Sequence, residues 1–268
     1  MGSSNRIDTL FHKLEKGKKV MNLFITAGYP DLDATVDLIL GFEKNGADII
    51  ELGMPFSDPL ADGPTIQRSS LKAIENGVSI SVIFQMVAKL REQSQIPIVL
   101  MGYVNPVIQY GVDAFCAKAA EVGVDGLIIP DLILEEAALI EDAAIANDLD
   151  FIHLVAPNSS DERMKAIDQR SNGFVYCVSV TGVTGARTAE EVSSSVDKFI
   201  DRVNLHVTKN PKLIGFGIKS YEDARKVTKK ADGFIVGSAL IDTIDKYYPL
   251  ENWQNEVFDF VHKLKNGE

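Results

Sequence analysis

The chain has 268 residues, of which 46% are hydrophobic, and a formal net charge of −11 at pH 7. This composition supports a large buried core, and no apolar run reaches the about 20 residues that a membrane-spanning helix needs. The acidic balance argues against broad nucleic-acid binding and favours a soluble protein.

Strands and helices alternate along the chain. After a helix over residues 6–15, eight strands are expected, at 21–26, 48–53, 98–102, 124–129, 151–155, 174–178, 213–216 and 233–236. Helices are expected at 33–45, 65–76, 80–93, 107–122, 134–147, 161–169, 189–202 and 220–228, as a short helix from 238 and as a last helix at 251–265.

This alternation predicts parallel strands joined by right-handed crossovers. Eight such units in about 250 residues predict an α/β protein with a closed (β/α)8 TIM barrel, formed as a single domain over residues 1–268. An extra helix precedes the barrel, and extra helices follow strands 2 and 8. The alternative is an open doubly wound sheet, which often carries a Gly-rich phosphate turn after its first strand. Here TAGYP stands at that place.

The stretch IIELGMPFSDPLADGP at 49–64 combines the second strand with a long loop. Strand alternation places Glu51 beside an apolar surface, where burial raises the pKa of a carboxyl and suits it to acid–base chemistry near neutral pH. The prolines stiffen the loop, and Asp62 can fold back toward Glu51. A plainer interpretation stays open, in which Glu51 pairs with a basic residue and the loop acids only form turns.

Barrel active sites lie at the carboxyl ends of the strands, so Tyr103, Asp131 and Tyr176 are further candidates by position. The loop at 179–188 is the second long one and is interpreted as a mobile lid, with Thr188 and Glu191 forming a capping box for the next helix. The alternative is that this loop is only a long connection without a function.

Strands 7 and 8 both end in glycines that favour a phosphate site. The glycines of GFG at 215–217 and Gly237 let backbone N–H groups approach an anion, and Ser238 opens a short helix whose positive end faces the same place. Barrels frequently bind phosphate in these two loops. We therefore predict a phosphate monoester as ligand.

The remaining polar residues predict no metal centre. The four histidines are scattered, and Cys116 and Cys177 lie far apart, outside any CxxC or Cys/His cluster. A reducing, cytoplasmic location is expected. The first residues lack the features of a signal peptide, and residues 1–5 are expected to be disordered or a remnant of cloning.

From about residue 7 to 265 the sequence resembles the tryptophan synthase α-subunit family. The resemblance rests on LFITAGYPD at 23–31, ELGMPFSDPLADGP at 51–64, VTGVTGAR at 180–187, GFGI at 215–218 and GSA at 237–239, in this order. It implies a lyase of tryptophan biosynthesis that cleaves indole-3-glycerol phosphate reversibly to indole and glyceraldehyde 3-phosphate, without a metal or organic cofactor.

The resemblance also implies roles for individual residues. Glu51 matches the catalytic acid–base of the family, and Asp62 matches its second catalytic carboxylate. Substrate-binding positions are matched by Phe24, Tyr103, Leu127 and Tyr176 in the indole and glycerol pocket, by Gly185, Gly217, Gly237 and Ser238 around the phosphate, and by Thr184 in the lid. Val180 is a departure, because some relatives carry an arginine there.

A partner is implied as well, a pyridoxal-phosphate β subunit in an α2β2 heterotetramer. Three alternatives remain open. The chain could be a lyase that releases indole without a partner, another sugar-phosphate barrel such as an isomerase or indole-glycerol-phosphate synthase, or a binding and regulatory subunit with negligible catalysis.

Overall fold

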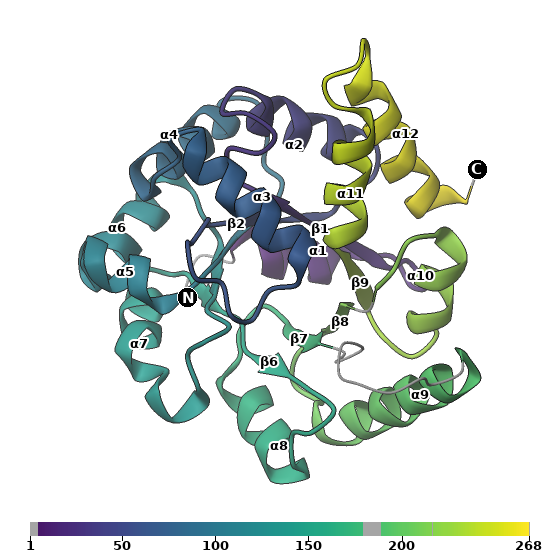
Figure 1. Ribbon diagram of the computed structural model, residues 1–268. Coiled ribbons are helices and arrows are strands. Elements are labelled where there is room, and N and C mark those ends of the chain that lie inside the picture. The colour runs from purple at the N-terminus through teal and green to yellow at the C-terminus, as the bar shows by residue number, and fades with distance from the viewer. Residues whose placement is uncertain (1–4, 179–188, 216, 268) are drawn as a thin grey trace.

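The computed structural model describes residues 5–178, 189–215 and 217–267, and its parallel strands curl into one sheet (Figure 1). In this described part the strands are β1 (Val20–Thr26), β2 (Ile49–Gly53), β3 (Ile98–Met101), β4 (Gly126–Ile128), β5 (Asp150–Phe151), β6 (Leu154–Val155), β7 (Val175–Val178), β8 (Lys212–Gly215) and β9 (Gly233–Val236). Their spatial order is β5-β4-β3-β2-β1-β9-β8-β7-β6. The α/β fold class and the parallel pairing are confirmed.

The ring closes at the fifth predicted strand. The segment expected as one strand over 151–155 forms two short ones, because β5 pairs with β4 whereas β6 pairs with β7. Ile152 and His153 join them, and their backbones bond to opposite neighbours: the Ile152 N–H donates to the Leu127 carbonyl at 3.0 Å, and the His153 carbonyl accepts from the Tyr176 N–H at 3.1 Å. Splitting this strand turns eight expected strands into nine within the described residues.

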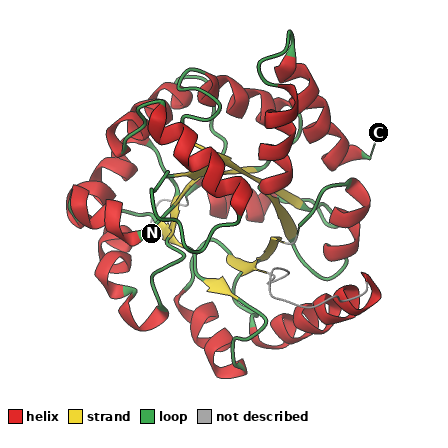
Figure 2. Cartoon of the chain, viewed as in Figure 1, coloured by secondary structure: helices red, strands yellow, loops and turns green. Residues whose placement is uncertain are grey.

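Helices surround the sheet (Figure 2). They are α1 (Arg6–Lys13), α2 (Ala34–Lys44), α3 (Pro64–Glu75), α4 (Ile80–Arg91), α5 (Val104–Tyr110), α6 (Val112–Val122), η1 (Leu134–Glu136), α7 (Ala138–Ala146), α8 (Asp161–Arg170), α9 (Ala189–His206), α10 (Tyr221–Val227), α11 (Ser238–Tyr247) and α12 (Trp253–Asn266).

The predicted helices differ from these at two places. The one expected over 107–122 is two helices, which meet at Gly111 with φ +95°, a conformation that glycine adopts without strain. The one over 134–147 begins as the 3₁₀ turn η1 before α7.

Two apolar cores follow from the alternation of side chains along buried strands. In β1, Met21, Leu23 and Ile25 pack in the layer between strands and helices. Val20 instead faces the barrel interior together with Ile49 of β2 and other side chains. All seven residues of β1 are buried, as expected for a parallel strand covered on both faces.

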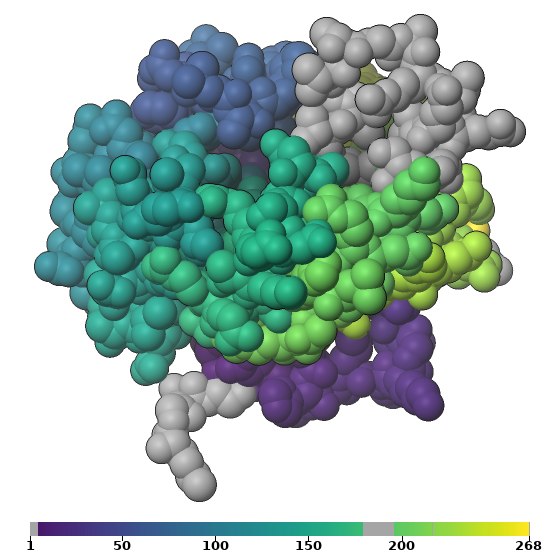
Figure 3. Space-filling view, turned by 90° about the horizontal axis from the view of Figure 1, so that it is seen from below, coloured from purple at the N-terminus to yellow at the C-terminus, as the bar shows by residue number. Residues whose placement is uncertain are grey.

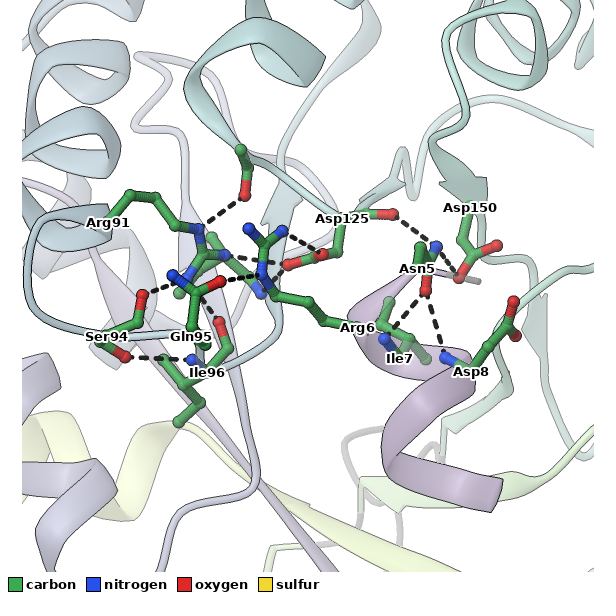
Figure 4. A network of polar contacts seen from close by, with 12 residues as sticks. Asn5, Arg6, Ile7, Asp8, Arg91, Ser94, Gln95, Ile96, Asp125 and Asp150 are labelled. Carbon is green, nitrogen blue, oxygen red and sulfur yellow. Dashed lines mark hydrogen bonds and ion pairs between the residues drawn. The ribbon is translucent and has the colours of Figure 1, made fainter. Parts of the chain in front are cut away.

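Helix α1 covers the amino-terminal end of the barrel, and Figure 3 shows the described N-terminal residues, in purple, at one end of the molecule. Its Ile7 is fully buried in the interior cluster. Figure 4 shows the polar contacts beside it, in which the buried Asp125 carboxylate accepts from Arg6 and Arg91, each at 2.9 Å. Asn5 caps the helix and donates to Asp150 Oδ2 at 2.7 Å. The extra N-terminal helix is thus tied to the strand starts.

None of the described helices is long and apolar enough by itself to cross a membrane. Helices α3 and α4 pass such a test of length and composition only as a pair, which is bent by 94°.

Candidate active site

Glu51 projects into the barrel interior from the middle of β2. It lies in register with Phe24 of β1 and Val99 of β3, and the residue is fully buried. Asn22 Nδ2 donates to Glu51 Oε1 at 2.5 Å, whereas Oε2 has no hydrogen-bond partner among the described residues.

Burial raises the pKa of Glu51 to about 8, against the smaller lowering by Asn22. A buried carboxylate with a single neutral donor is poorly solvated, so the group holds its proton near neutral pH. It can therefore both give and take a proton there, as the strand pattern predicted.

Asp62 lies in the loop after β2, which folds back over the strand ends. The loop turns through two backbone bonds, from Leu60 N–H to the Asp58 carbonyl at 2.9 Å and from Asp62 N–H to the Pro59 carbonyl at 3.0 Å. Burial raises the pKa of the Asp62 carboxyl, and a hydrogen bond from Tyr103 opposes this. Both predicted carboxyl groups thus have raised pKa values at the same end of the barrel.

Tyr103 holds this loop in place. Its hydroxyl accepts from the Ala61 N–H at 3.0 Å, which leaves its own proton for Asp62. Its ring packs against Phe56, with centroids 5.3 Å apart. Tyr103 is buried and is not among the described residues that line the cavity below.

A cavity of about 300 Å³ opens beside Asp62. Its described lining comprises Phe24, Asp62, Ile66, Met101, Tyr176, Gly215, Gly217, Ile218, Lys219, Ile235, Gly237, Ser238, Ala239 and Asp242. The predicted carboxylate of Asp62, the apolar side chains and the glycines that were predicted to bind phosphate therefore line the same cavity.

Glu51 is not among the described residues that line this cavity, but its register partner Phe24 is. Burial raises the pKa of the Tyr176 hydroxyl, and the charges of Glu51 and Asp62 raise it further. Phe24 fits closely above β2, because a Cβ on Gly53 would lie 2.6 Å from its ring. Glycine at 53 is needed for that ring position.

The opposite wall contains the glycines and the helix start that were predicted to bind phosphate. Gly217 has φ +46°, and a Cβ added there would meet no atom within 4 Å. Gly237 precedes α11, which begins at Ser238 and has no acidic residue in its first turn. The first N–H groups of a helix lack intrahelical partners and carry its positive dipole end, so this wall can bind an anion.

Several lining residues were not predicted. Lys219, just past the GFGI motif, adds a cation to the lining, and Asp242 adds an acid one turn into α11. Lys219 had a sequence signal, its position two residues after Gly217, but Asp242 had none. Ile66 and Met101 complete the apolar wall from α3 and β3.

Leu127 requires a correction, because it was expected in the substrate pocket. It is fully buried in the layer between strands and helices and is absent from the cavity lining in the described chain. Its neighbour Ile128 faces the interior instead. The alternation in β4 therefore turns Leu127 outward. Val180, Thr184, Gly185 and the predicted lid at 179–188 lie outside the described residues.

The remaining polar candidates have structural surroundings. His153 is buried, and its Nε2 lies 3.4 Å from Glu141, which also pairs with Arg170. Asp131 Oδ1 accepts from the Val104 N–H at 3.0 Å, at the start of α5. Within the described ranges, no group of three His, Cys, Asp or Glu side chains is arranged to hold a metal ion.

Comparison with known proteins agrees with this geometry. Residues 11–267 match the model of the family described as tryptophan synthase alpha chain. The chain belongs to this family. A tryptophan synthase alpha chain from Caldanaerobacter subterraneus subsp. tengcongensis is 49% identical over 262 residues, which cover 97% of this chain and 98% of that one. Another, from Flavobacterium johnsoniae, is 42% identical and is covered completely.

Solved structures of tryptophan synthase alpha chains share the fold. One from Legionella pneumophila superimposes with a TM-score of 0.88 at 37% identity, covering 98% of this chain and 97% of that one. A chain from a Mycobacterium tuberculosis tryptophan synthase structure, in an aminoacrylate- and BRD0059-bound form, gives 0.86 at 33% identity, with 99% and 98% covered. The barrel prediction is confirmed, and membership makes the chain an enzyme subunit of tryptophan biosynthesis.

Proposed function

We propose that the chain cleaves indole-3-glycerol phosphate reversibly to indole and glyceraldehyde 3-phosphate. Family membership supports this reaction, and so does a cavity that has the Asp62 carboxyl on one side and the glycines and helix start proposed to bind phosphate on the other. The observation that carries the proposal is Glu51, a buried carboxyl with a pKa near 8 and one oxygen free of described partners.

The cleavage needs one proton delivered and one removed. Protonation of indole C3 places positive charge on the ring, and deprotonation of the adjacent side-chain hydroxyl drives electrons toward the bond to C3. That bond breaks, its electron pair restores the aromatic indole, and the former hydroxyl carbon becomes the aldehyde of glyceraldehyde 3-phosphate. No net proton is consumed, so one group can serve both transfers.

We assign both proton transfers to Glu51. We assign binding of the indole ring of the substrate to Asp62. An Asp62 carboxylate that accepts from the indole N–H stabilises the positive charge that develops on the ring. Phe24 and Tyr176 form the apolar wall, while Gly217, Gly237 and Ser238 take the phosphate. Thr184 and Gly185 are proposed substrate contacts on the strength of family membership. The proposed reaction uses neither a metal nor an organic cofactor.

The test is indole release by the isolated chain and by its Glu51→Gln variant. Loss of a general acid–base should lower turnover by at least about 100-fold and leave binding of glycerol 3-phosphate largely intact. Asp58→Asn is the matched control, because Asp58 lies in the same loop and its carboxylate bonds to the exposed Ser57 hydroxyl. Near-normal release by Glu51→Gln would refute the assignment. No release by the unaltered chain would favour a binding subunit.

We further propose a cytoplasmic α2β2 assembly with a tryptophan synthase β subunit, a pyridoxal-phosphate enzyme. Three exposed apolar side chains at the carboxyl end of the barrel support a partner there. Leu60 is 94% exposed in the loop after β2, Ile108 is 47% exposed on α5, and Ile133 is 53% exposed after β4. The two free, buried cysteines suit a reducing compartment.

Light scattering of the chain mixed with a β subunit from a close relative tests the assembly. Leu60→Asp should weaken complex formation, whereas Leu205→Asp should not, since Leu205 is exposed on the distant helix α9. Full indole release without any complex would instead favour a lyase that acts alone.

A further inference from the structure

A second cavity lies on the outer surface of the barrel, between α10, the end of α12 and the turn before β1. Figure 1 shows α10 beside the C-terminal end of the chain. The cavity measures about 470 Å³, which is within the range of small-molecule sites, about 300–1,000 Å³. It shares no lining residue with the candidate active site. Its described lining is Gly17, Lys18, Lys19, Tyr221, Ala224, Arg225, Thr228, Lys229, Phe234, Leu264, Lys265 and Asn266.

The inner part of this cavity is apolar. Ala224 from α10, Phe234 from β9 and Leu264 from α12 contribute side chains that are at most 4% exposed. Thr228 is also buried, and its hydroxyl is already bonded to the Ala224 carbonyl at 2.7 Å. The innermost lining is therefore apolar and offers a ligand few hydrogen bonds.

The rim is strongly basic, although the whole chain is acidic. Five of the twelve lining residues are Lys or Arg and none is Asp or Glu. Lys18, Arg225 and Lys229 form no ion pair with any residue that the structure describes. The net charge of −11 already favours solubility, so solubility does not explain why three cations without ion-pair partners gather at one cavity.

The other two lysines are already engaged. Lys265 Nζ pairs with Asp48 Oδ2 at 2.5 Å, and Lys19 Nζ donates to the Ala231 carbonyl at 2.7 Å. The nearby acids have donors as well: Asp232 accepts from the Lys212 N–H at 2.8 Å, and Asp223 accepts from the Lys219 N–H at 3.2 Å. The positive charge that remains for a ligand therefore comes from Lys18, Arg225 and Lys229.

Arg225 is held by an aromatic ring instead of a carboxylate. Its guanidinium carbon lies 5.7 Å from the centroid of Tyr221, a cation–π distance. Tyr221 is itself packed closely against Gly267, where an added Cβ would lie 2.7 Å from the ring. A guanidinium oriented in this way keeps its N–H groups for phosphate or carboxylate oxygens.

We propose that this cavity binds a small organic polyanion of about the size of a nucleoside diphosphate. Its charged groups contact Lys18, Arg225 and Lys229, and its apolar or planar body points toward the inner lining of Ala224, Phe234 and Leu264. Three cations favour a ligand with at least two negative charges, and the apolar inner lining favours an organic ligand over an inorganic ion. The site is separate from the proposed reaction and does not depend on it.

Titration calorimetry on the full chain tests this proposal with ADP, inorganic pyrophosphate and adenosine as probes. The cavity variant carries Arg225→Gln and Lys229→Gln. The matched control carries Lys226→Gln and Lys230→Gln, which removes the same charge from α10 and the following turn at positions outside the lining. Melting temperature verifies that both variants fold, and indole release without ADP should be unchanged.

We expect saturable binding of ADP that the cavity variant weakens by at least about tenfold, as for the loss of charge-assisted hydrogen bonds, and that the control variant retains. Added salt should weaken it, because the rim is exposed. Equal losses in both variants would reveal general attraction and overturn the site. Pyrophosphate binding as tightly as ADP would overturn the role of the inner lining, and no saturable ADP binding would overturn the proposal.

Discussion

Two buried carboxyl groups, Asp125 and Glu51, have opposite surroundings. At the amino-terminal end, Asp125 accepts from Arg6, Arg91 and the backbone N–H of Ile98, all within 2.9 Å. Toward the carboxyl end, Glu51 has Asn22 as its described donor and keeps one oxygen unpartnered. A carboxylate with several donors stabilises the fold, whereas one left poorly solvated is costly and keeps a proton available for chemistry. The surroundings of Asp125 therefore favour stability, whereas those of Glu51 suit the proposed proton transfers.

The largest expected effect comes from removing the carboxyl group of Asp125. Asp125→Ala leaves Arg91, whose side chain is 10% exposed, without its carboxylate partner. Breaking a buried pair in this way should lower the free energy of unfolding by about 3–5 kcal/mol. Urea denaturation measures the loss. Glu121→Ala, which breaks an exposed pair with Lys118 on α6, is the control and should change stability little.

Glu51→Gln should increase the free energy of unfolding, whereas Asp125→Ala decreases it. The pKa rises from 4.5 to about 8 on folding, so between these pH values the unfolded chain releases a proton that the folded chain keeps. Stability therefore falls as pH rises through this window, and it levels off above it. The variant lacks this slope and should be more stable at alkaline pH by a few kcal/mol.

Unfolding curves of the two proteins at several pH values measure the difference. It should be small below the ordinary pKa of Glu and grow up to about pH 8. A constant difference across that range would show that Glu51 is not held protonated by the fold.

Asp62→Asn tests the second carboxyl group of the candidate site. Loss of the charge that stabilises the ring should lower kcat/KM for indole release by about 10–100-fold, with less effect on binding of glycerol 3-phosphate. Because the pKa of Asp62 is raised, kcat/KM of the unaltered chain should begin to fall with acid above the usual range of Asp. The variant should lack this acid limb, and its persistence would assign the limb to another group.

The smallest effect concerns the cap of α1. Asn5 Oδ1 accepts from the Ile7 N–H at 2.8 Å and the Asp8 N–H at 3.1 Å. Asn5→Ala should cost about 1 kcal/mol in thermal or urea unfolding, as for other N-caps. Ser79→Ala is a weaker control, since its cap bond to Val82 is 3.4 Å long. An equal loss in both variants would mean that the contact of Asn5 with Asp150 adds nothing.

Local patterns were enough to predict where several residues of the candidate site lie. Alternation placed Glu51 inward with Ile49, and the raised pKa follows from that burial. Glycines at the ends of two strands were predicted to lie together, because parallel strand ends share one rim, and they do line one cavity. The break at Gly111 also had a local signal, a glycine in the middle of the expected helix.

Other features depend on contacts between distant segments. Nothing in FIHLV at 151–155 indicates that its two halves pair with different neighbours. In β4, Gly126, Leu127 and Ile128 are all apolar, so the pattern cannot tell which of them faces outward. Asp242 reaches the cavity because α11 packs against α3, where Arg68 and Thr65 both bond to it.

The change of partner at Ile152 and His153 makes this place the seam of the ring. Only two residues separate the last pairing with β4 from the first pairing with β7. After a deletion of one residue here, the segment can keep its pairing with β4 or with β7, but not with both. The lost pairing would leave backbone donors and acceptors without partners on both sides of the gap. Such open edges join other chains, so we expect the damage from a shortened seam to be self-association.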